Sequence, residues 1–524
     1  MLKKITLFCS LLTFLACSTL QKTPHSMEPH RPGFHFTPPS MWMNDPNGMV
    51  YYEGEYHLFY QYHPESAVWG PMHWGHAVST DMVHWTHLPI ALYPDDRGLI
   101  FSGSAVVDWK NTSGFGKDGK PPLVAIFTQH LMEGEKAGRS DFQYQSIAYS
   151  NDRGRTWTKY AGNPVVPNTK KIKDFRDPKV IWDEGSNQWV MVFAAQDHVK
   201  IWGSNDLKKW NHLSDFGQSA GAHGGVWECP DFFPMTIEES NEKRWVLLQS
   251  LNPGSPNGGS GTQYFVGNFD GKTFTLDPAF SGSTKKESGV WLDWGRDNYA
   301  GVTWSDVPVS DGRRLFLGWM SNWDYAMVVP TEKWRSAMTL PRTLNLVKTA
   351  AGPRLTSQPV KELETLRGKK HTLAPQTLEK SYSLTDRFGF SPASAELILD
   401  FDLASSTANR FGIELSNSKG ERYLVGYNVA KNHFFSDRLH AGDLSFSNKF
   451  AERIHIAPRS IKDNKIQLHV FFDVASAELF ADGGLIALTD IFFPGEAFNR
   501  AQIFVEDGSV KLLKAECYRI RPSR

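Results

Sequence analysis

The stretch GSNDLKKWNHL at residues 203–213 is the third copy of a turn that recurs along the first part of this chain. Earlier copies are STDMVHWTHL at 79–88 and SNDRGRTWTKY at 150–160, and NFDGKTFTL at 268–276 is a weaker copy with a phenylalanine in place of the tryptophan. Each copy has an aspartate that opens a turn, then an aromatic residue and a polar, strand-like run. The aspartates are 71, 54 and 64 residues apart, which leaves room for four strands and their loops.

Repeated four-stranded units that share one turn are typical of a β-propeller. Two hairpin signals agree with this reading, one around Glu53-Gly54 in GMVYYEGEYHLFYQYHP and one around Gly185-Ser186-Asn187 in KVIWDEGSNQWVMVFAAQ. Helical periodicity is nearly absent, so we expect an all-β chain. A β-sandwich whose turns are similar by coincidence is the alternative that this pattern leaves open.

The composition and patterning of the sequence change after residue 345. The segment LVKTAAGPRLTSQPVKELETLRGKKHTL is charged and resembles a linker that is partly helical. Strand-like runs with few tryptophans follow, among them SAELILDFDL, RFGIELSN and KIQLHVFFDV. We therefore predict a propeller over residues 35–345, a linker over 346–370 and a C-terminal β-sandwich over 371–524.

Charge and composition limit the classes of partner. The chain of 524 residues has 56 Lys and Arg against 56 Asp and Glu, so its formal net charge is zero and no basic nucleic-acid-binding face is expected. Aromatic residues make up 13% of the chain, with 18 tryptophans, many in polar, turn-rich surroundings. Planar rings in polar surroundings suit stacking on sugars, whereas covering a large β core is the more ordinary role of any single tryptophan.

The N-terminus reads as an export signal. Lys3 and Lys4 precede the apolar run Ile5 to Leu15, which is too short to span a bilayer as a mature helix. The segment resembles a bacterial lipoprotein signal (residues 1–16) with lipidation at Cys17, followed by a polar tether over 17–34. An ordinary secretion signal is the alternative. We expect an exported protein, in the periplasm or at the cell surface of a bacterium, that touches the membrane only through this anchor.

Neither the cysteines nor the histidines indicate a structural bridge or a metal site. Cys229 and Cys517 are far apart in sequence, and we expect no disulfide between them. His73 and His76 form an H-x-x-H pair, but residues three apart on a strand point to opposite faces. We therefore predict no metal ligands.

Three acidic positions stand out as candidates for chemistry. Asp45 lies in WMNDPNG, where a proline and a tight turn hold the carboxylate rigidly, although a plain Asx-turn would look the same. Asp177 follows Arg176 in DFRDPKV. Arg296-Asp297 is a second Arg-Asp pair, and the residues alone do not decide which of the two pairs belongs to the site. Glu228 lies in GGVWECPDFF, an apolar segment that suits a general acid.

Together these motifs resemble a known family. WMNDPNG, FRDP and WECP, in this order along a propeller-like chain, are similar to glycoside hydrolase family 32, the β-fructofuranosidases. The stretches FYQYHP, WGPMHWGHAVSTDMVHW, FSGSAVVD, DWGRDNYAGVTW and GWMSNWDYA support the resemblance, as do SDRLHAGDLSF and VFFDVASAELFADGG in the second domain. The resemblance covers nearly the whole chain after the tether. It implies a five-bladed β-propeller followed by a C-terminal β-sandwich.

The resemblance also implies roles for individual residues. It makes Asp45 the nucleophile, Glu228 the acid/base and Asp177 a transition-state stabiliser, and it favours Arg176-Asp177 over Arg296-Asp297. No cofactor is expected, since retaining glycoside chemistry needs two carboxyl groups. Trp42 would be an indole in the wall of the funnel. The side chains that the resemblance assigns to substrate binding, together with neighbours of the acids, are Trp42, Asn44, Gln61, Trp69, Phe101, Ser102, Arg176 and Trp323.

Within the family, FSGSAVVD, VWECPDFF and GWMSNWDYA look most like bacterial exo-levanases and exo-inulinases. The expected function is therefore release of fructose from the ends of levan or inulin, with sucrose as a further substrate. An endo-levanase or an invertase of the same family is one alternative. A non-catalytic propeller that binds fructan is another, of a different class.

Overall fold

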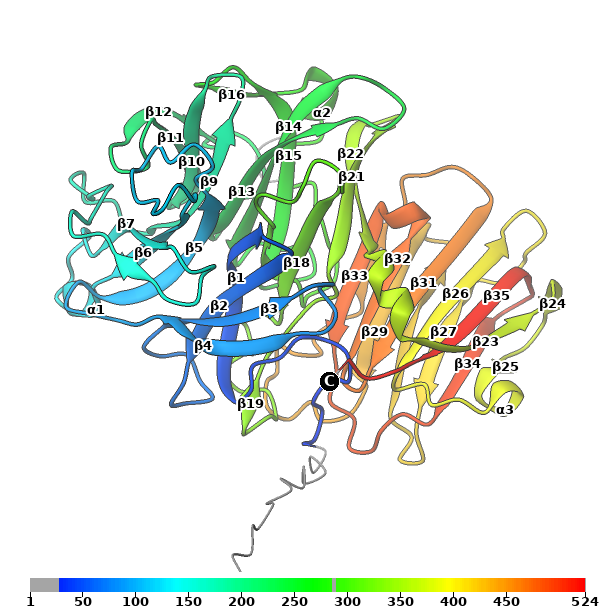
Figure 1. Ribbon diagram of the computed structural model, residues 1–524. Coiled ribbons are helices and arrows are strands. Elements are labelled where there is room, and N and C mark those ends of the chain that lie inside the picture. Colours follow the sequence, from blue (N-terminus) through cyan, green and yellow to red (C-terminus); the bar gives the residue numbers. More distant parts are fainter. Residues whose placement is uncertain (1–27, 285–288, 524) are drawn as a thin grey trace, which may run out of the picture.

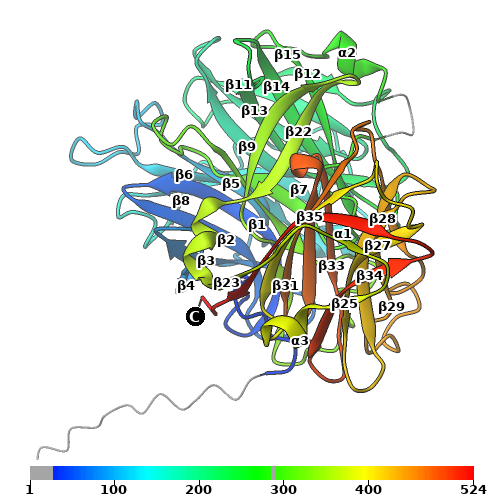
Figure 2. The same ribbon diagram turned by 90° about the vertical axis from the view of Figure 1, so that its right-hand side faces the viewer.

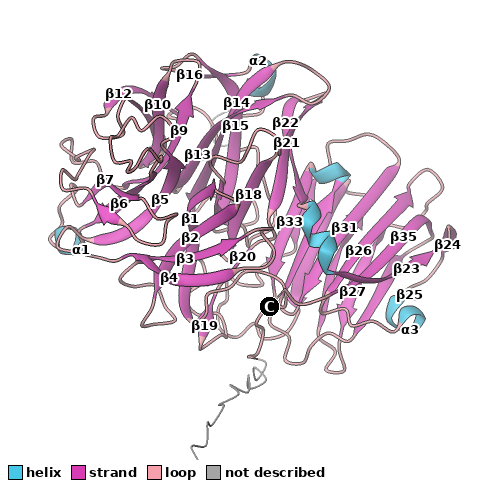
Figure 3. Cartoon of the chain, viewed as in Figure 1, coloured by secondary structure: helices cyan, strands magenta, loops and turns pink. Residues whose placement is uncertain are grey.

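The computed structural model of the chain describes residues 28–284 and 289–523, and their regular secondary structure is almost only β-strand (Figures 1 and 3). The predicted signal (1–16), Cys17 and most of the predicted tether lie outside the described residues. The tether ends earlier than predicted, because the backbone N–H groups of Gly33 and Phe34 already donate hydrogen bonds to Asp473 at 2.7 and 3.1 Å. In the described segments no helix is long and apolar enough to cross a bilayer.

The first part of the described chain forms five sheets in sequence order, as the predicted propeller requires. Their strands are, sheet by sheet, β1 (Met41–Tyr52), β2 (Glu55–His63), β3 (His73–Ser79) and β4 (Thr86–Leu92); β5 (Leu99–Val107), β6 (Leu123–His130), β7 (Gln143–Ser150) and β8 (Thr158–Lys159); β9 (Phe175–Asp183), β10 (Gln188–Ala195), β11 (His198–Ser204) and β12 (Asn211–Phe216); β13 (Val226–Thr236), β14 (Lys243–Asn252), β15 (Gly261–Phe269) and β16 (Phe274–Leu276); and β17 (Tyr299–Thr303), β18 (Arg314–Met320), β20 (Ala337–Met338), β21 (Arg342–Thr349) and β22 (Gly352–Pro359).

The innermost strands of these blades close a ring. Strand β1 contacts β5, β5 contacts β9, β9 contacts β13, β13 contacts β17 and β17 contacts β1. The short strand β19 (Trp334–Arg335) then pairs in parallel with the start of β1, which joins the last blade to the first. Blades arranged around an axis leave no long free edge at the closure, and the axis is available for polar side chains.

The repeated turn identified in the sequence joins the third and fourth strands of four successive blades. In the third copy Asp206 accepts hydrogen bonds from the N–H groups of Lys208 and Lys209, and the indole of Trp210 donates to the carbonyl of Leu207 at 3.0 Å. The first two copies repeat the indole-to-carbonyl contact through Trp85 and Trp157. This turn therefore marks one blade each time it occurs.

The second part of the chain is a sandwich of two antiparallel sheets, confirming that prediction (Figures 1 and 2). One sheet contains β23 (Arg367–Leu373), β24 (Gln376–Leu378), β26 (Ala395–Asp402), β31 (Lys465–Asp473), β32 (Ser476–Ala481), β33 (Ile486–Ile491) and β35 (Val510–Ile520); the other contains β25 (Tyr382–Ser383), β27 (Arg410–Ser416), β28 (Arg422–Asn428), β29 (His433–His440), β30 (His455–Pro458) and β34 (Arg500–Glu506).

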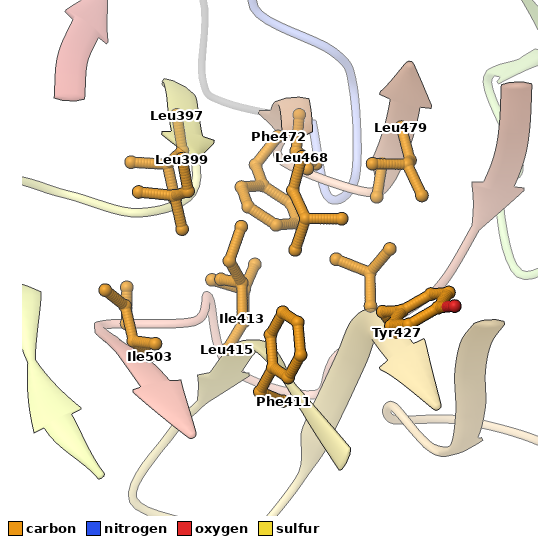
Figure 4. Packing of buried hydrophobic residues seen from close by; sticks show 14 of the residues in the cluster. Leu397, Leu399, Phe411, Ile413, Leu415, Tyr427, Leu468, Phe472, Leu479 and Ile503 are labelled. Atoms are coloured by element: carbon orange, nitrogen blue, oxygen red, sulfur yellow. The ribbon is translucent and has the colours of Figure 1, made fainter. Parts of the chain in front are cut away.

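The core of the sandwich lies between its two sheets. Figure 4 shows Leu397 and Leu399 of β26 on one side of the core and Ile413 and Leu415 of β27 on the other, each with labelled side chains of neighbouring strands beside it. These residues occupy every second position of their strands, so each strand turns one face to the core. The helices α1 (Met132–Lys136), α2 (Pro278–Ser281) and α3 (Leu384–Phe388) are short and peripheral.

The predicted linker over 346–370 is wrong in extent. Residues 342–359 form the hairpin β21–β22 of the last blade, and Arg367 already begins β23 of the sandwich. Only Val360 and the 3₁₀ turn η1 (Lys361–Leu366) connect the two. Outer strands of a blade alternate buried and exposed residues and carry charges on their solvent face, so their composition resembles that of a linker.

Buried ion pairs join the propeller to the sandwich. Arg342 of β21 lies 2.9 Å from Asp293 and also pairs with Glu478 of β32, and these side chains are fully buried. His35, which precedes the first blade, contacts Asp473 at 2.7 Å and Glu478 at 2.9 Å. Burial alone would lower the pKa of His35, but hydrogen bonds to these two acids and their charges raise it to about 9.

This imidazolium makes stability depend on pH. His35 binds its proton more tightly when folded, so its contribution is complete below pH 6.5 and is lost as the pH rises towards 9. We expect the free energy of unfolding to fall by up to about 3 kcal/mol over this interval. Urea unfolding at intervals between pH 6 and 9 measures the slope. His35→Gln should flatten it, whereas the half-exposed His84→Gln should not; an unchanged slope in His35→Gln would contradict the assignment.

Candidate active site

The innermost strand of every blade loses its ladder register near its N-terminal end. In β1 the break falls between Asn44 and Pro46, so that Asp45 is the extra residue. The corresponding breaks contain Phe101–Ser102 in β5, Asp177–Pro178 in β9, Cys229–Pro230 in β13 and Ala300–Gly301 in β17. A bulge bends its strand and redirects side chains, and here the bulges bring polar groups from different blades together at one end of the axis.

Three of these breaks combine the predicted acids with a proline. Proline has no N–H to donate, and a bulged strand does not require one at this position. Asp177 and Cys229 adopt φ values of 66° and 46°, a left-handed conformation that costs such residues about 1–3 kcal/mol each. The N–H of Asp177 is held by the hydroxyl of Thr128 at 2.9 Å. The sequences DP, RDP and ECP are thus the local signature of bulged inner strands.

Asp45 is buried and held by short hydrogen bonds. Its Oδ1 accepts one from the amide of Asn44 at 2.9 Å and its Oδ2 accepts one from the hydroxyl of Ser102 at 2.7 Å. Burial raises the pKa of Asp45, the two hydrogen bonds oppose this, and the charge of Glu228 adds to the increase. The carboxyl group of Asp45 therefore has one fixed orientation, and its pKa depends on the charge of Glu228.

Cys229 connects Asp45 to Asp177. Its thiol lies 3.5 Å from Oδ2 of Asp45 and 3.6 Å from Oδ2 of Asp177, and its N–H donates to the same oxygen of Asp177 at 3.0 Å. Burial and the three nearby carboxyl groups raise the pKa of this thiol well above its ordinary value. Cys229 is therefore a neutral hydrogen-bonding group between two acids rather than a nucleophile.

Burial raises the pKa of Asp177 to about 7; the guanidinium of Arg176 acts in the opposite direction, and the charges of Glu228 and Asp45 add to the increase. Arg176 contacts Asp177 only at 3.9 Å. Its Nη2 donates to Glu228 at 2.9 Å instead. The arginine next to Asp177 in sequence thus binds a different acid more closely than its neighbour, because the bulge turns the two side chains apart.

Glu228 is the most exposed of the three acids, with a side chain 20% accessible. Its Oε1 accepts two hydrogen bonds from Arg176, at 2.9 and 3.2 Å, and its Oε2 accepts one from the hydroxyl of Tyr299. Asp174 binds the other side of the guanidinium. Four carboxyl groups, those of Asp45, Asp174, Asp177 and Glu228, share one guanidinium in this cluster, which favours a state in which at least one of the acids carries a proton.

The other predicted binding residues surround this cluster. Gln61 lies opposite Asn44 in the β1–β2 ladder and donates to Asn47 at 2.7 Å. Phe101 stacks on His130 with ring centroids 4.2 Å apart, and Trp69 meets the ring of Phe101 edge-on. Phe101, Trp69 and Trp323 are partly exposed.

Trp42 differs from its predicted place in the funnel wall. Its side chain is fully buried, its indole N–H donates to Asn44 at 2.7 Å, and Trp323 stacks over it at 5.9 Å. The indole therefore positions Asn44, and through Asn44 it positions Asp45. A tryptophan in a polar motif looked available for stacking, but the side chain of a residue far along the chain covers it.

The loop that carries Trp323 is fastened to the sandwich. Asp324 pairs with Arg296 and with Lys449, and the hydroxyl of Tyr325 donates to Asp297 at 2.6 Å. Arg438 of the sandwich then binds both Asp297 and Tyr325, at 2.6 and 2.8 Å. Arg296-Asp297, the rival pair in the sequence, thus lies in the buried contact between the two parts of the molecule.

Tyr299 is the site residue that sequence reasoning missed. It lies within DWGRDNYAGVTW, but a single tyrosine in a strand gives no local signal. Its role is visible only because β17 returns to the axis beside β13. As for metal ions, the described part of the chain contains no group of three His, Cys, Asp or Glu side chains suited to hold one.

Comparison with known families agrees with this architecture. Residues 35–359 match the Glycosyl hydrolases family 32 N-terminal domain, and residues 362–519 match the Glycosyl hydrolases family 32 C terminal domain. The chain belongs to glycoside hydrolase family 32. The N-terminal match ends where β22 ends, at Pro359.

Named relatives of this family 32 hydrolase are similar over most of its length. A levanase of Bacillus subtilis is 47% identical over 513 residues, which are 98% of this chain and 73% of the relative. An extracellular exo-inulinase of Aspergillus awamori is 40% identical over 94% of this chain and 95% of its own.

Two solved structures share the fold. The exo-inulinase of Aspergillus awamori superimposes with a TM-score of 0.86 at 37% identity, covering 95% of this chain and 99% of its own. A β-fructofuranosidase of Schwanniomyces occidentalis complexed with fructosyl-erythritol has a TM-score of 0.81 at 33% identity, covering 94% of this chain and 98% of its own.

Tyr299→Phe tests the contact to Glu228. The variant removes one hydrogen bond to a carboxyl group, for which we expect a loss of about 1.5–3 kcal/mol, or about 10- to 150-fold in kcat/KM for sucrose. Initial rates across a pH series, with a melting curve, measure the effect. Tyr264→Phe, a buried tyrosine of the outer strand β15, should retain activity. Full activity in Tyr299→Phe would show that its hydroxyl does not act on Glu228.

Proposed function

We propose that this hydrolase is an exo-acting, retaining β-fructosidase that releases fructose from the ends of levan or inulin and also cleaves sucrose. The observation that supports this most strongly is the convergence of Asp45, Asp177 and Glu228 on the bulged ends of three inner strands. A levanase and exo-inulinases among the relatives support the substrate class.

In this proposal Asp45 attacks the anomeric carbon of the terminal fructosyl unit. Retaining hydrolases use two carboxyl groups about 5–5.5 Å apart, one as nucleophile and one as acid. Asp45 is oriented for attack by Asn44 and Ser102, which hold one lone pair on each oxygen. The thiol of Cys229 also contacts Oδ2, at 3.5 Å, so the lone pair that remains for the sugar is on Oδ1.

Glu228 would protonate the departing oxygen and later deprotonate a water molecule. It is the acid with the greatest exposure, as an incoming water and a leaving group require. Arg176 and Tyr299 fix its two oxygens, so the acid keeps its position through both steps. Oriented donors of this kind need little rearrangement as charge develops.

Asp177 would bind hydroxyl groups of the fructosyl ring. Its Oδ1 has no hydrogen bond within the described residues, whereas Oδ2 is taken by Cys229. A carboxylate that binds sugar hydroxyls more strongly as the ring flattens lowers the barrier rather than only the KM. The partly exposed rings of Phe101, Trp69 and Trp323 would supply apolar contacts to the sugar.

We also propose that the enzyme acts outside the cytoplasm. The N-terminal segment has the order of charged, apolar and small residues of an export signal, and Cys17 follows as the residue to be lipidated. Two of the relatives are named extracellular exo-inulinases. A tethered enzyme would meet polymers too large for uptake.

Products distinguish this proposal from its rivals. Wild-type enzyme incubated separately with levan, inulin and sucrose should release free fructose from the first time point. Asp45→Asn and Glu228→Gln should each lower kcat on sucrose by at least about 10³-fold while the protein stays folded. Early long oligosaccharides would indicate an endo enzyme, activity on sucrose alone an invertase, and binding without cleavage a carbohydrate-binding propeller.

A further inference from the structure

The end of the propeller axis opposite the catalytic acids contains a cavity of about 270 Å³. The acids lie near the N-terminal ends of β9 and β13, whereas the cavity is lined by residues further along the same strands, including Lys179, Trp182 and Asp231. At about 3.3 Å per residue, Phe233 lies roughly 17 Å along β13 from Glu228. We call this space the basal cavity; its polar wall is Trp109, Lys179, Trp182, Asp231, Asp306 and Arg314.

The basal cavity is separated from the catalytic end by an ion pair on the axis. The ammonium group of Lys179 lies 3.4 Å from Asp231 and donates to the carbonyl of Thr303, and both charged side chains are buried. A ligand in this cavity therefore cannot reach the three catalytic acids. Any binding there has a purpose other than catalysis.

The wall offers hydrogen-bond donors that the protein does not use. Within the described residues, the guanidinium of Arg314 has no hydrogen bond or ion pair; it lies 4.6 Å from the centroid of the Phe233 ring, and the charges of Asp231 and Asp306 act on it from a greater distance. The indole N–H of Trp182 is buried and likewise has no partner in that part of the chain. A buried donor without an acceptor, such as the Trp182 indole, is costly unless a ligand or water supplies one, whereas Arg314 is partly exposed.

Acceptors lie beside these donors, and the charges balance. Asp306 accepts from the N–H of Val107 at 2.8 Å and from the indole of Trp109 at 2.9 Å, which leaves further lone pairs. The lining has three basic side chains and three acidic ones: Lys110, Lys179 and Arg314, and Glu184, Asp231 and Asp306. A further lining residue, Arg313, is already bound by Asp311 and Glu362. Neither an anion nor a cation is favoured by such a wall. A neutral ligand rich in hydroxyl groups, each both donor and acceptor, fits it.

Trp109 adds a platform for such a ligand. Its side chain is 60% exposed, although it is one of the largest apolar groups in the protein. The ring is nevertheless held, because its N–H donates to Asp306 and its neighbour Tyr52 lies 5.9 Å away. An exposed indole fixed in one orientation can stack on the C–H face of a sugar without losing much conformational freedom.

We propose that the basal cavity is a second, non-catalytic binding site for fructosyl units of the polymer. A groove of about 560 Å³ adjoins it and shares Arg313 and Arg314, so a chain of several sugars has room to continue. The choice of fructan as ligand rests on the proposed function. The presence of the cavity and of its unused donors does not depend on that function. Binding there would keep the enzyme on a polymer between cleavages and raise the local concentration of chain ends.

The test compares a polymer with a substrate too short to reach both sites. Trp109→Ala should raise the KM for levan about 2- to 10-fold, the usual range for loss of one aromatic contact, with kcat and all parameters for sucrose unchanged. Trp109→Phe should restore part of the effect. Val309→Ala, an almost fully exposed neighbour that does not line the cavity, is the matched control.

Binding is measured separately in inactive protein. Glu228→Gln should migrate more slowly in native gels that contain levan, and Glu228→Gln with Trp109→Ala should lose at least half of this retardation. Equal KM values for levan in wild type and Trp109→Ala, an equal change in KM for sucrose, or equal retardation of the two Glu228→Gln proteins would overturn the basal site. Failure of the wild type to cleave either substrate would instead overturn the proposed function. The gel experiment would still test the basal site, because it measures levan binding and does not depend on cleavage.

Discussion

The site depends on one constraint: the inner strand of each blade breaks register at the same level. A regular ladder would alternate its side chains between the two faces of the blade, and neighbouring acids would point apart. The bulges at Asp45, Ser102, Asp177, Cys229 and Ala300 change this locally. Prolines and left-handed residues in the same places are the backbone cost of turning several side chains to one point.

The surrounding protein holds this arrangement in layers. Asn44 and Ser102 orient Asp45, Trp42 orients Asn44, and Trp323 covers Trp42. The loop of Trp323 is in turn fastened to the sandwich through buried charges, of which Arg438 with Asp297 is the most enclosed pair. The sandwich therefore contributes to the site without a residue beside the acids, because removing it would expose these charges and release the loop.

Much of this was readable from the sequence where local chemistry dictates structure. The Asp-turn-Trp repeat marks the blades because its hydrogen bonds are local, and the three acid motifs are visible because a proline one or two residues after an acid suits a bulged strand. The sequence predicts a linker from residue 346, where the structure has most of the β21–β22 hairpin, because an outer strand is half polar. Two contacts could not be predicted from the sequence: that of Tyr299 with Glu228 and the stacking of Trp323 on Trp42. Each joins residues more than 70 positions apart.

In the proposed mechanism Asp45 is the group presented to the sugar as nucleophile. The most direct measurement is to trap the intermediate: Glu228→Gln is incubated with fructosyl fluoride, whose leaving group needs no protonation, and the protein is digested and analysed by mass spectrometry. We expect one added fructosyl unit on the peptide that contains Asp45. A label on Asp177 or on any other residue, or an inverted product with no label, would contradict it.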